Sequence, residues 1–221
     1  NQVVNCFAGG NGGYGIEVGY NSIVNDSIAV NNQNTGILAG VSSTVRNNTS
    51  HDNQAGYGIY AGSGSILEGN TVYQNRGTGI FADTSSIINN NTVRSNDEFG
   101  ITASTRSKVT GNVVTENSKT AIFAYSQMII TDNIIQGNNT SNNPNLMGLN
   151  IGSHSKVESN NLYNNAQNNI YVAGNKNVII GNHTAFSGAG INFQVTGNYY
   201  KDNTASGNTV NYDLNGTTQT D

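Results

Sequence analysis

The chain has 221 residues, of which only 10% are charged, and its formal net charge is −4. It holds nine Lys and Arg residues and no cluster of them that could follow a phosphate backbone, so the composition argues against a nucleic-acid partner. No stretch is long and apolar enough to span a membrane, and the lone cysteine, Cys6, excludes an internal disulfide.

A unit of about 21 residues repeats along almost the whole chain. It reads Gly-Ile-x-Ala-x-x-x-Ser-x-Val-x-x-Asn-x-Val-x-x-Asn-x-x-Thr. Successive copies begin at Gly15, Gly36, Gly58, Gly79, Gly100, Ala121, Gly148 and Asn169, with a shorter copy from Gly190. Within a unit the apolar residues lie two apart, as Ile80 and Ala82 do, which is the alternation of a strand. Each unit is therefore predicted to form three short strands separated by three turns.

One such unit cannot bury its apolar residues alone, but stacked units can. Strands that meet their equivalents in the next unit are parallel, and the handedness of parallel crossovers favours a right-handed solenoid. We therefore expect an all-β, right-handed, single-stranded parallel β-helix with nine to ten coils. The uniform repeat predicts one domain over residues 1–221, with an irregular coil or tail at 204–221. Because the sequence begins within a unit and without Met, we expect it to be a piece of a longer chain.

Asparagines recur at two places in the unit. At a bend, an Asn amide is both donor and acceptor, so stacked copies can bond one another and the buried turn backbone. The first column is predicted to be a structural ladder of Asn48, Asn70, Asn91, Asn112, Asn133, Asn160, Asn182 and Asn198. A second column is predicted to run from Asn11 and Asn32 through Asn165 to Asn203, and a lesser column contains Ser43, Ser65, Ser86 and Ser107.

The recurring Gly-Ile-x-Ala and Val-x-x-Asn-x-Val runs resemble the right-handed parallel β-helix repeats of the pectin-lyase-like superfamily. The resemblance covers nearly the entire chain and implies the fold more specifically than the function. That superfamily includes polysaccharide lyases, polygalacturonase-like hydrolases, pectin esterases, alginate epimerases, phage tailspikes and non-catalytic surface proteins. Function must therefore be argued from the site.

The resemblance implies that the Gly-Ile strand lines a polysaccharide groove. Its Ile and Ala residues point inward, and the residues between them point outward. These outward residues are Glu17, Leu38, Tyr60, Phe81, Thr102, Phe123, Asn150, Tyr171 and Asn192. We expect Tyr60, Phe81, Phe123 and Tyr171 to form a sugar-binding strip, which Tyr57 and Phe99 could widen. The alternative is that loops cover these rings and that they serve packing.

The turn after this strand carries Asp83, Arg106, Tyr125 and His154 in four successive units. Lyases and epimerases that act on uronates need a cation to neutralise the carboxylate and a base to take the adjacent proton. We assign Arg106 to the first role, Tyr125 or His154 to the second, and Asp83 to orienting the arginine. The alternative is that these polar turn residues fall together by chance.

The period breaks once substantially, where six residues are inserted within 138–147, a segment that also holds the only proline, Pro144. Insertions in repeat proteins map to loops, often on the binding face, although a tolerated surface excursion is the alternative. The sharper motifs of the superfamily's hydrolases, pectate lyases and epimerases are missing. No metal site is predicted, no cofactor is evident, and the sequence lacks the acidic cluster that Ca²⁺ would need.

We therefore expect a secreted, cell-surface or virion-surface β-helix that binds a polysaccharide and could act as a lyase or epimerase on an acidic glycan. The alternative is a non-catalytic structural or adhesive rod, or a tailspike-like module, that could form a homo-oligomer.

Overall fold

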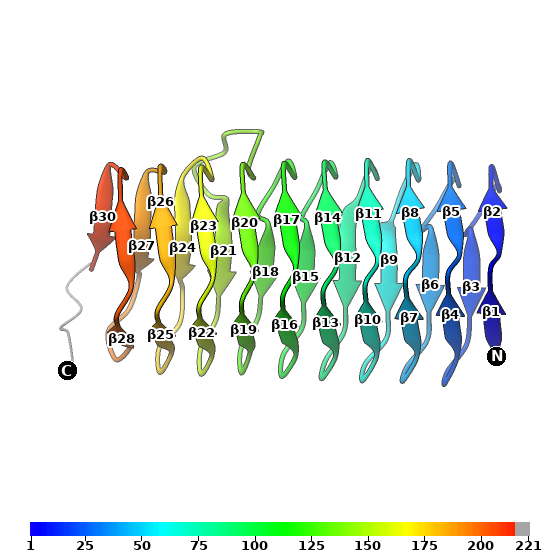
Figure 1. Cartoon of the computed structure of the whole chain (residues 1–221), viewed down its shortest axis with the longest axis horizontal. Helices are drawn as coiled ribbons and strands as arrows, with labels where there is room; N and C mark the ends of the chain where they lie inside the picture. Colours follow the sequence, from blue (N-terminus) through cyan, green and yellow to red (C-terminus); the bar gives the residue numbers. More distant parts are fainter. Residues whose placement is uncertain (215–221) are drawn as a thin grey trace.

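The computed structural model describes residues 1–214, which form ten stacked coils (Figure 1). Each coil contributes one strand to each of three ten-stranded parallel sheets, called here sheets A, B and C. β1 lies at one end of the rod and β30 at the other. The predicted all-β parallel solenoid with about 21 residues per coil is confirmed, and the coil number is ten.

The strands are mostly three residues long and follow one another in the order A, B, C. Sheet A consists of β1 (Gln2–Val4), β4 (Ile23–Asn25), β7 (Thr44–Arg46), β10 (Ile66–Glu68), β13 (Ile87–Asn89), β16 (Lys108–Thr110), β19 (Ile129–Thr131), β22 (Lys156–Glu158), β25 (Val178–Ile180) and β28 (Tyr199–Lys201). Sheet B consists of β2 (Phe7–Gly9), β5 (Ile28–Val30), β8 (Thr49–His51), β11 (Thr71–Tyr73), β14 (Thr92–Arg94), β17 (Val113–Thr115), β20 (Ile134–Gln136), β23 (Asn161–Tyr163), β26 (His183–Ala185) and β29 (Thr204–Ser206). Sheet C consists of β3 (Ile16–Val18), β6 (Ile37–Ala39), β9 (Tyr57–Ala61), β12 (Thr78–Ala82), β15 (Ile101–Ala103), β18 (Ile122–Ala124), β21 (Met147–Ile151), β24 (Asn168–Val172), β27 (Ala189–Phe193) and β30 (Val210–Asp213).

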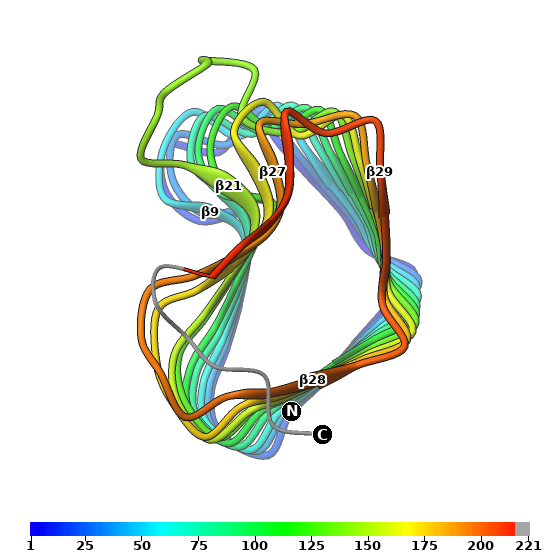
Figure 2. The same ribbon diagram turned by 90° about the vertical axis from the view of Figure 1, so that its left-hand side faces the viewer.

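The core lies inside the tube that the three sheets enclose (Figure 2). Sheets A and B each point one aliphatic column inward and sheet C points two, and residues such as Leu67 of sheet A, Val72 of sheet B and Ile80 of sheet C have no exposed surface. Because equivalent residues of neighbouring coils stack directly on one another, each coil buries apolar surface that it could not bury alone.

The first asparagine column forms the predicted ladder at the bend between sheets A and B. The Asn112 Oδ1 accepts hydrogen bonds from both the backbone N–H and the Nδ2 of Asn91, each at 2.9 Å. The Asn112 Nδ2 donates to the Ile88 carbonyl and to the Asn133 Oδ1, each at 3.0 Å. Ladder asparagines therefore satisfy the buried turn backbone of neighbouring coils and join these coils to one another. The same pattern runs from Asn48 to Asn182.

The last coil is more regular than the sequence predicted. β29 and β30 pair in register with β26 and β27, so residues 204–213 continue the solenoid, whereas 215–221 lie outside the described residues. The predictions that Asn198 belongs to the first ladder and that Asn203 belongs to the second column are wrong. Asn182 bonds to the Oδ1 of Asn203, which lies 21 residues further on. Asn198 instead continues the serine column through Asn177, and the second asparagine column reaches Asn208 through Ser187.

The first residue of the repeat is a glycine in most coils because the bend before sheet C is crowded. A Cβ built on Gly79 would lie 2.5 Å from the Val93 Cγ1 and 2.7 Å from the Gly100 carbonyl oxygen. Both distances are shorter than Cβ contacts in proteins allow, so the close packing of coils at this bend requires glycine.

Candidate functional site

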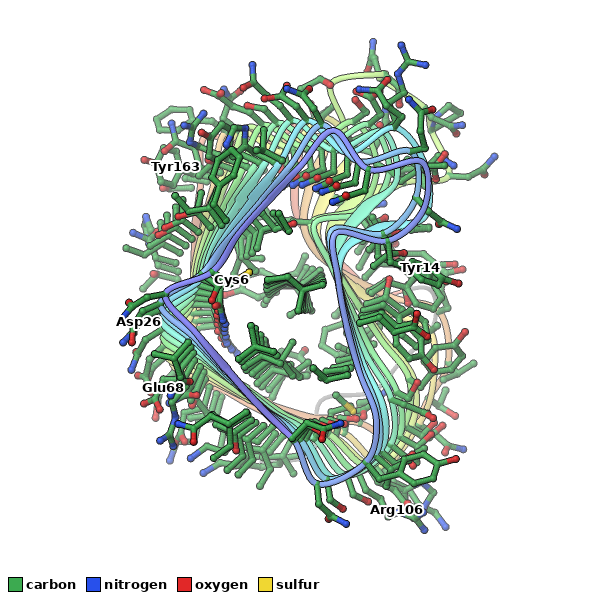
Figure 3. All side chains as sticks on the ribbon, turned by 90° about the vertical axis from the view of Figure 1, so that its right-hand side faces the viewer. Cys6, Tyr14, Asp26, Glu68, Arg106 and Tyr163 are labelled. Atoms are coloured by element: carbon green, nitrogen blue, oxygen red, sulfur yellow. The ribbon has the colours of Figure 1, made fainter. Side chains whose placement is uncertain are left out.

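The predicted outward column of sheet C is present in the structure. Strand pairing places Tyr60 beside Phe81, Phe81 beside Thr102, and Thr102 beside Phe123. The column continues through Asn150, Tyr171 and Asn192. We call the turn from a strand of sheet B to the next strand of sheet C the B–C turn, and the turn from sheet C to the next strand of sheet A the C–A turn. Sheet C lies between the B–C turn that carries Tyr14 and the C–A turn that carries Arg106 (Figure 3).

Two groups of aromatic side chains cover the middle of sheet C. Tyr57, Tyr60 and Phe81 form the first group, with ring centroids 5.2–5.6 Å apart. The second group contains Phe99, Phe123 and Tyr125, with centroids 5.3–5.6 Å apart. Thr102 lies between the two groups and is only 8% exposed, so it places little polar surface between them. We call these six rings the aromatic strip.

The ring orientations refine the sugar-stacking prediction. Tyr60 and Phe81 stack on each other at an interplanar angle of 4°, so each covers one face of the other. By contrast, the Tyr125 ring stands at 77° to Phe123 and is 50% exposed. Within the strip, Tyr125 is therefore the ring best placed to offer a free face to a sugar. It was predicted as a catalytic base, and its direct contact with the strip could not be read from the sequence.

Asp83 lies beside the first group, and its predicted role of orienting Arg106 stays a prediction. Its Oδ2 accepts a hydrogen bond from the Ser63 hydroxyl at 3.0 Å, and its Oδ1 accepts one from the Thr84 N–H at 2.7 Å. Burial raises the pKa of the Tyr60 phenol above its usual value, and the nearby charges of Asp83 and Tyr57 raise it further. Tyr60 is therefore protonated at neutral pH and can donate a hydrogen bond.

An ion pair borders the second aromatic group, which the sequence analysis did not identify. The Lys119 Nζ contacts the Glu98 carboxylate and lies 5.6 Å from the centroid of the Phe99 ring. Both residues belong to B–C turns, whereas the sequence analysis considered only the turn that follows the Gly-Ile strand. A polar donor and an acceptor thus lie directly beside apolar rings.

The predicted catalytic residues lie after successive strands of sheet C but occupy two different columns. Asp83 and Tyr125 each follow directly the last residue of β12 and β18. Arg106 and His154 lie further along the C–A turn, in left-handed backbone conformation with φ of 64° and 58°. Within residues 1–214, no hydrogen bond or ion pair joins any two of the four. Their catalytic role stays a prediction.

The insertion within 138–147 forms a loop between β20 and β21 that projects beyond the other B–C turns (Figure 2). Ladder partners across it are 27 residues apart instead of 21. The Asn139 N–H donates to the Lys119 carbonyl at 3.1 Å, and the Ser141 hydroxyl donates to the Ser118 carbonyl at 2.8 Å. The loop is therefore anchored on the turn that carries Lys119.

Beyond the aromatic strip, the outward column of sheet C becomes rich in amides. Asn150 and Asn192 flank the half-buried Tyr171. The Asn192 Nδ2 donates to the Asn168 Oδ1 at 3.3 Å, and its Oδ1 accepts from the Gln194 Nε2 at 2.6 Å. This part of the sheet offers donors and acceptors rather than ring surface. Within residues 1–214 the Tyr171 ring contacts no other aromatic ring, unlike the other three predicted sugar-binding residues.

Two features are absent from residues 1–214. No group of three His, Cys, Asp or Glu side chains is placed to hold a metal ion. The described chain also has no helix with the length and hydrophobicity that crossing a membrane requires.

Solved structures with the same architecture include enzymes named for polysaccharides. The A-module of mannuronan C-5 epimerase AlgE6 from Azotobacter vinelandii is 16% identical, with a TM-score of 0.72 over 85% of this chain and 58% of that one. Pectate lyase Pel9A is 16% identical, with a TM-score of 0.68 over 89% of this chain and 62% of that one. The Dettilon tailspike protein is 16% identical, with a TM-score of 0.68 over 96% of this chain and 60% of that one.

These likenesses establish the fold, and the chain spans about 60% of the length of the three structures. The sequence has no match among curated proteins. The family model described as "Right handed beta helix region" matches residues 1–140, which is more than half of the chain. The repeat, the three parallel sheets and this match together show that the chain belongs to the right-handed β-helix family.

Proposed function

We propose that this protein binds a polysaccharide along the outer face of sheet C. The observation that carries the proposal is the aromatic strip, in which six rings lie over four successive coils of sheet C. Aromatic rings offer apolar surface to the CH faces of sugars, and the half-exposed Tyr125 offers the freest ring. The Lys119–Glu98 pair and the amides of Asn150 and Asn192 supply hydrogen-bonding groups for hydroxyls beside the rings.

The direction of the strip suits a polymer. Strands of neighbouring coils are spaced by roughly 4.8 Å, so six rings over four coils present a track along the rod axis rather than one closed pocket. A long chain can contact such a track at several positions at once. The fold is shared with an epimerase named for mannuronan and a lyase named for pectate, which supports a polysaccharide over other linear polymers.

Binding without catalysis is the function that the geometry favours. A lyase or epimerase needs its cation and its base around the same atom of the substrate, and within residues 1–214 no hydrogen bond or ion pair joins Arg106 to Tyr125 or His154. We further propose that the protein acts outside the cytoplasm, where polysaccharides are found. One structure with a similar fold is named a periplasmic alginate epimerase.

The test compares two variants on a panel of neutral and acidic polysaccharides. Replacing Tyr60, Phe81 and Phe123 by alanine should weaken binding by roughly ten-fold or more, because the rings lose their contacts with sugar. The matched control replaces Tyr73 and Tyr163, two half-buried tyrosines of sheet B, by alanine and should bind like the wild type.

Circular dichroism establishes whether the strip variant is folded. Tyr125→Ala keeps the test decisive, because this exposed ring can be removed with little effect on stability and should still reduce affinity. Equal affinities of all variants and wild type would contradict the proposal. Release of unsaturated products, measured by their ultraviolet absorbance, would show that lyase chemistry accompanies binding.

A further inference from the structure

The C–A corner after β15, β18, β21 and β24 collects positive charge. One side chain per coil occupies the left-handed position of this turn: Arg106, Gln127, His154 and Lys176, with φ of 57–64°. The turns are held in step by backbone hydrogen bonds between coils, for example from the Gln127 N–H to the Ser153 carbonyl at 2.8 Å. All four side chains are exposed.

The first outward column of sheet A adds two lysines to the same corner. Lys108 pairs with Ile129, and Ile129 pairs with Lys156, so the two lysines lie two strands apart, or roughly 9.6 Å. Together with Arg106 and Lys176 they make four of the nine Lys and Arg residues of the chain. We call Arg106, Lys108, His154, Lys156 and Lys176 the basic corner.

Few negative charges neutralise the basic corner. The Lys156 Nζ lies 2.7 Å from the Glu158 Oε2, and both side chains are more than one third exposed. Within residues 1–214, Arg106, Lys108 and Lys176 take part in no ion pair. A local excess of positive charge on a protein of net charge −4 creates a field that attracts anions to this corner.

Part of the basic corner lines a shallow hollow of about 350 Å³. Gln127, His154, Lys156 and Lys176 line it, and Ile129 and Val178 form part of its apolar surface. Ile129 is 47% exposed, so the hollow offers aliphatic surface beside its cations. Cations around an aliphatic surface suit a ligand that carries both anionic groups and CH faces.

From this arrangement we propose that the basic corner binds an acidic polysaccharide, at a site separate from the aromatic strip. The cations follow the rod axis, so they match a linear chain with anions at intervals better than they match a compact ion. A single-stranded nucleic acid is disfavoured because no aromatic side chain lines the hollow to stack on a base. Arg106 and His154, predicted as catalytic residues, would here hold anionic groups of the polymer.

The test variant is Arg106→Gln/Lys176→Gln. Glutamine fits both positions, because Gln127 already occupies the same column with φ of 62°. The matched control, Arg76→Gln/Arg94→Gln, removes the same number of exposed cations away from the corner, from the turn after sheet B and from sheet B. Affinities are measured at low ionic strength for polygalacturonate, its methyl ester, dextran sulfate and oligothymidylate.

The test variant should bind polygalacturonate or dextran sulfate roughly ten-fold more weakly than wild type, with a smaller dependence of affinity on salt, whereas the control should bind like wild type. The tighter of the two polymers identifies the anion as carboxylate or sulfate. Unchanged binding by the test variant, an equal loss in the control, or tighter wild-type binding to oligothymidylate would overturn the proposal. Binding of the uncharged methyl ester tests the aromatic strip independently and should be equal in all three proteins.

Discussion

Two adjacent asparagines allow a direct test of the ladder. Asn160 is 1% exposed, and its Oδ1 accepts hydrogen bonds from the Asn133 N–H at 3.0 Å and the Asn133 Nδ2 at 2.9 Å. Its own Nδ2 donates to the Ile130 and Glu158 carbonyls, each at 3.0 Å, and to the Asn182 Oδ1 at 2.9 Å. Asn161 is exposed in β23. The equivalent residue of the preceding coil is Ile134, so this position accepts an aliphatic side chain.

Replacing Asn160 by leucine leaves the Asn133 N–H without its acceptor inside the turn, whereas the Asn133 Nδ2 keeps its bonds to the Val109 and Thr131 carbonyls. The change also removes the hydrogen bonds that the Asn160 Nδ2 donates. A buried polar group without a partner costs about 1–3 kcal/mol and each lost hydrogen bond about 1 kcal/mol, so we expect a loss of about 4 kcal/mol in the free energy of unfolding. For a chain of this size that corresponds to a drop of roughly 8–16 °C in Tm. Asn161→Leu, the same chemical change one residue later, should alter stability by no more than about 0.5 kcal/mol.

Thermal and urea denaturation followed by circular dichroism measure both variants. Equal losses of stability in Asn160→Leu and Asn161→Leu would refute the reasoning, because they would show that the buried amide contributes no more to the free energy of unfolding than an exposed one.

Two further predictions follow from local geometry. Gly79→Ala should cost about 1–3 kcal/mol, because the new Cβ overlaps neighbouring atoms, whereas Gly12→Ala, which has open space, should change the denaturation midpoint little. The raised pKa of Tyr60 contributes stability that is fully present below the unfolded-state value near pH 10 and is lost as the pH rises through the higher folded value. Asp83→Asn should lower this pKa only partly, because burial is its largest cause, and a spectrophotometric titration against Tyr60→Phe measures the change. A titration that Asp83→Asn leaves unaltered would rule out the proposed charge effect.

The sequence predicted the columns because any residue of a strict repeat meets its equivalent one coil later. Tyr60, Phe81 and Phe123 therefore line up as expected, and so do the ladder asparagines up to Asn182. The prediction failed at Asn198 because the last coil was expected to be short. A regular step of 21 residues leads from Asn182 to Asn203 instead.

Contacts between different columns could not be predicted in the same way. Lys108 and Lys156 flank Ile129 in one column, but a step of 21 residues precedes Ile129 and one of 27 follows it, so the insertion conceals their relation. Ring orientation was equally inaccessible, because the repeat fixes where a Cβ lies but not how a ring turns on its neighbour. The stacking of the Tyr60 ring on the Phe81 ring is such a case.

The most direct test of polysaccharide binding on sheet C is a titration followed by aromatic ¹³C NMR. The chain contains 11 Tyr and 6 Phe residues and no Trp, so the rings can be assigned by single substitutions. Binding along the aromatic strip should shift the resonances of Tyr60, Phe123 and Tyr125 and leave those of Tyr73 and Tyr163 on sheet B unchanged. Shifts confined to the sheet B tyrosines, or no shift with any polysaccharide of the panel, would contradict the assignment of sheet C as the binding face.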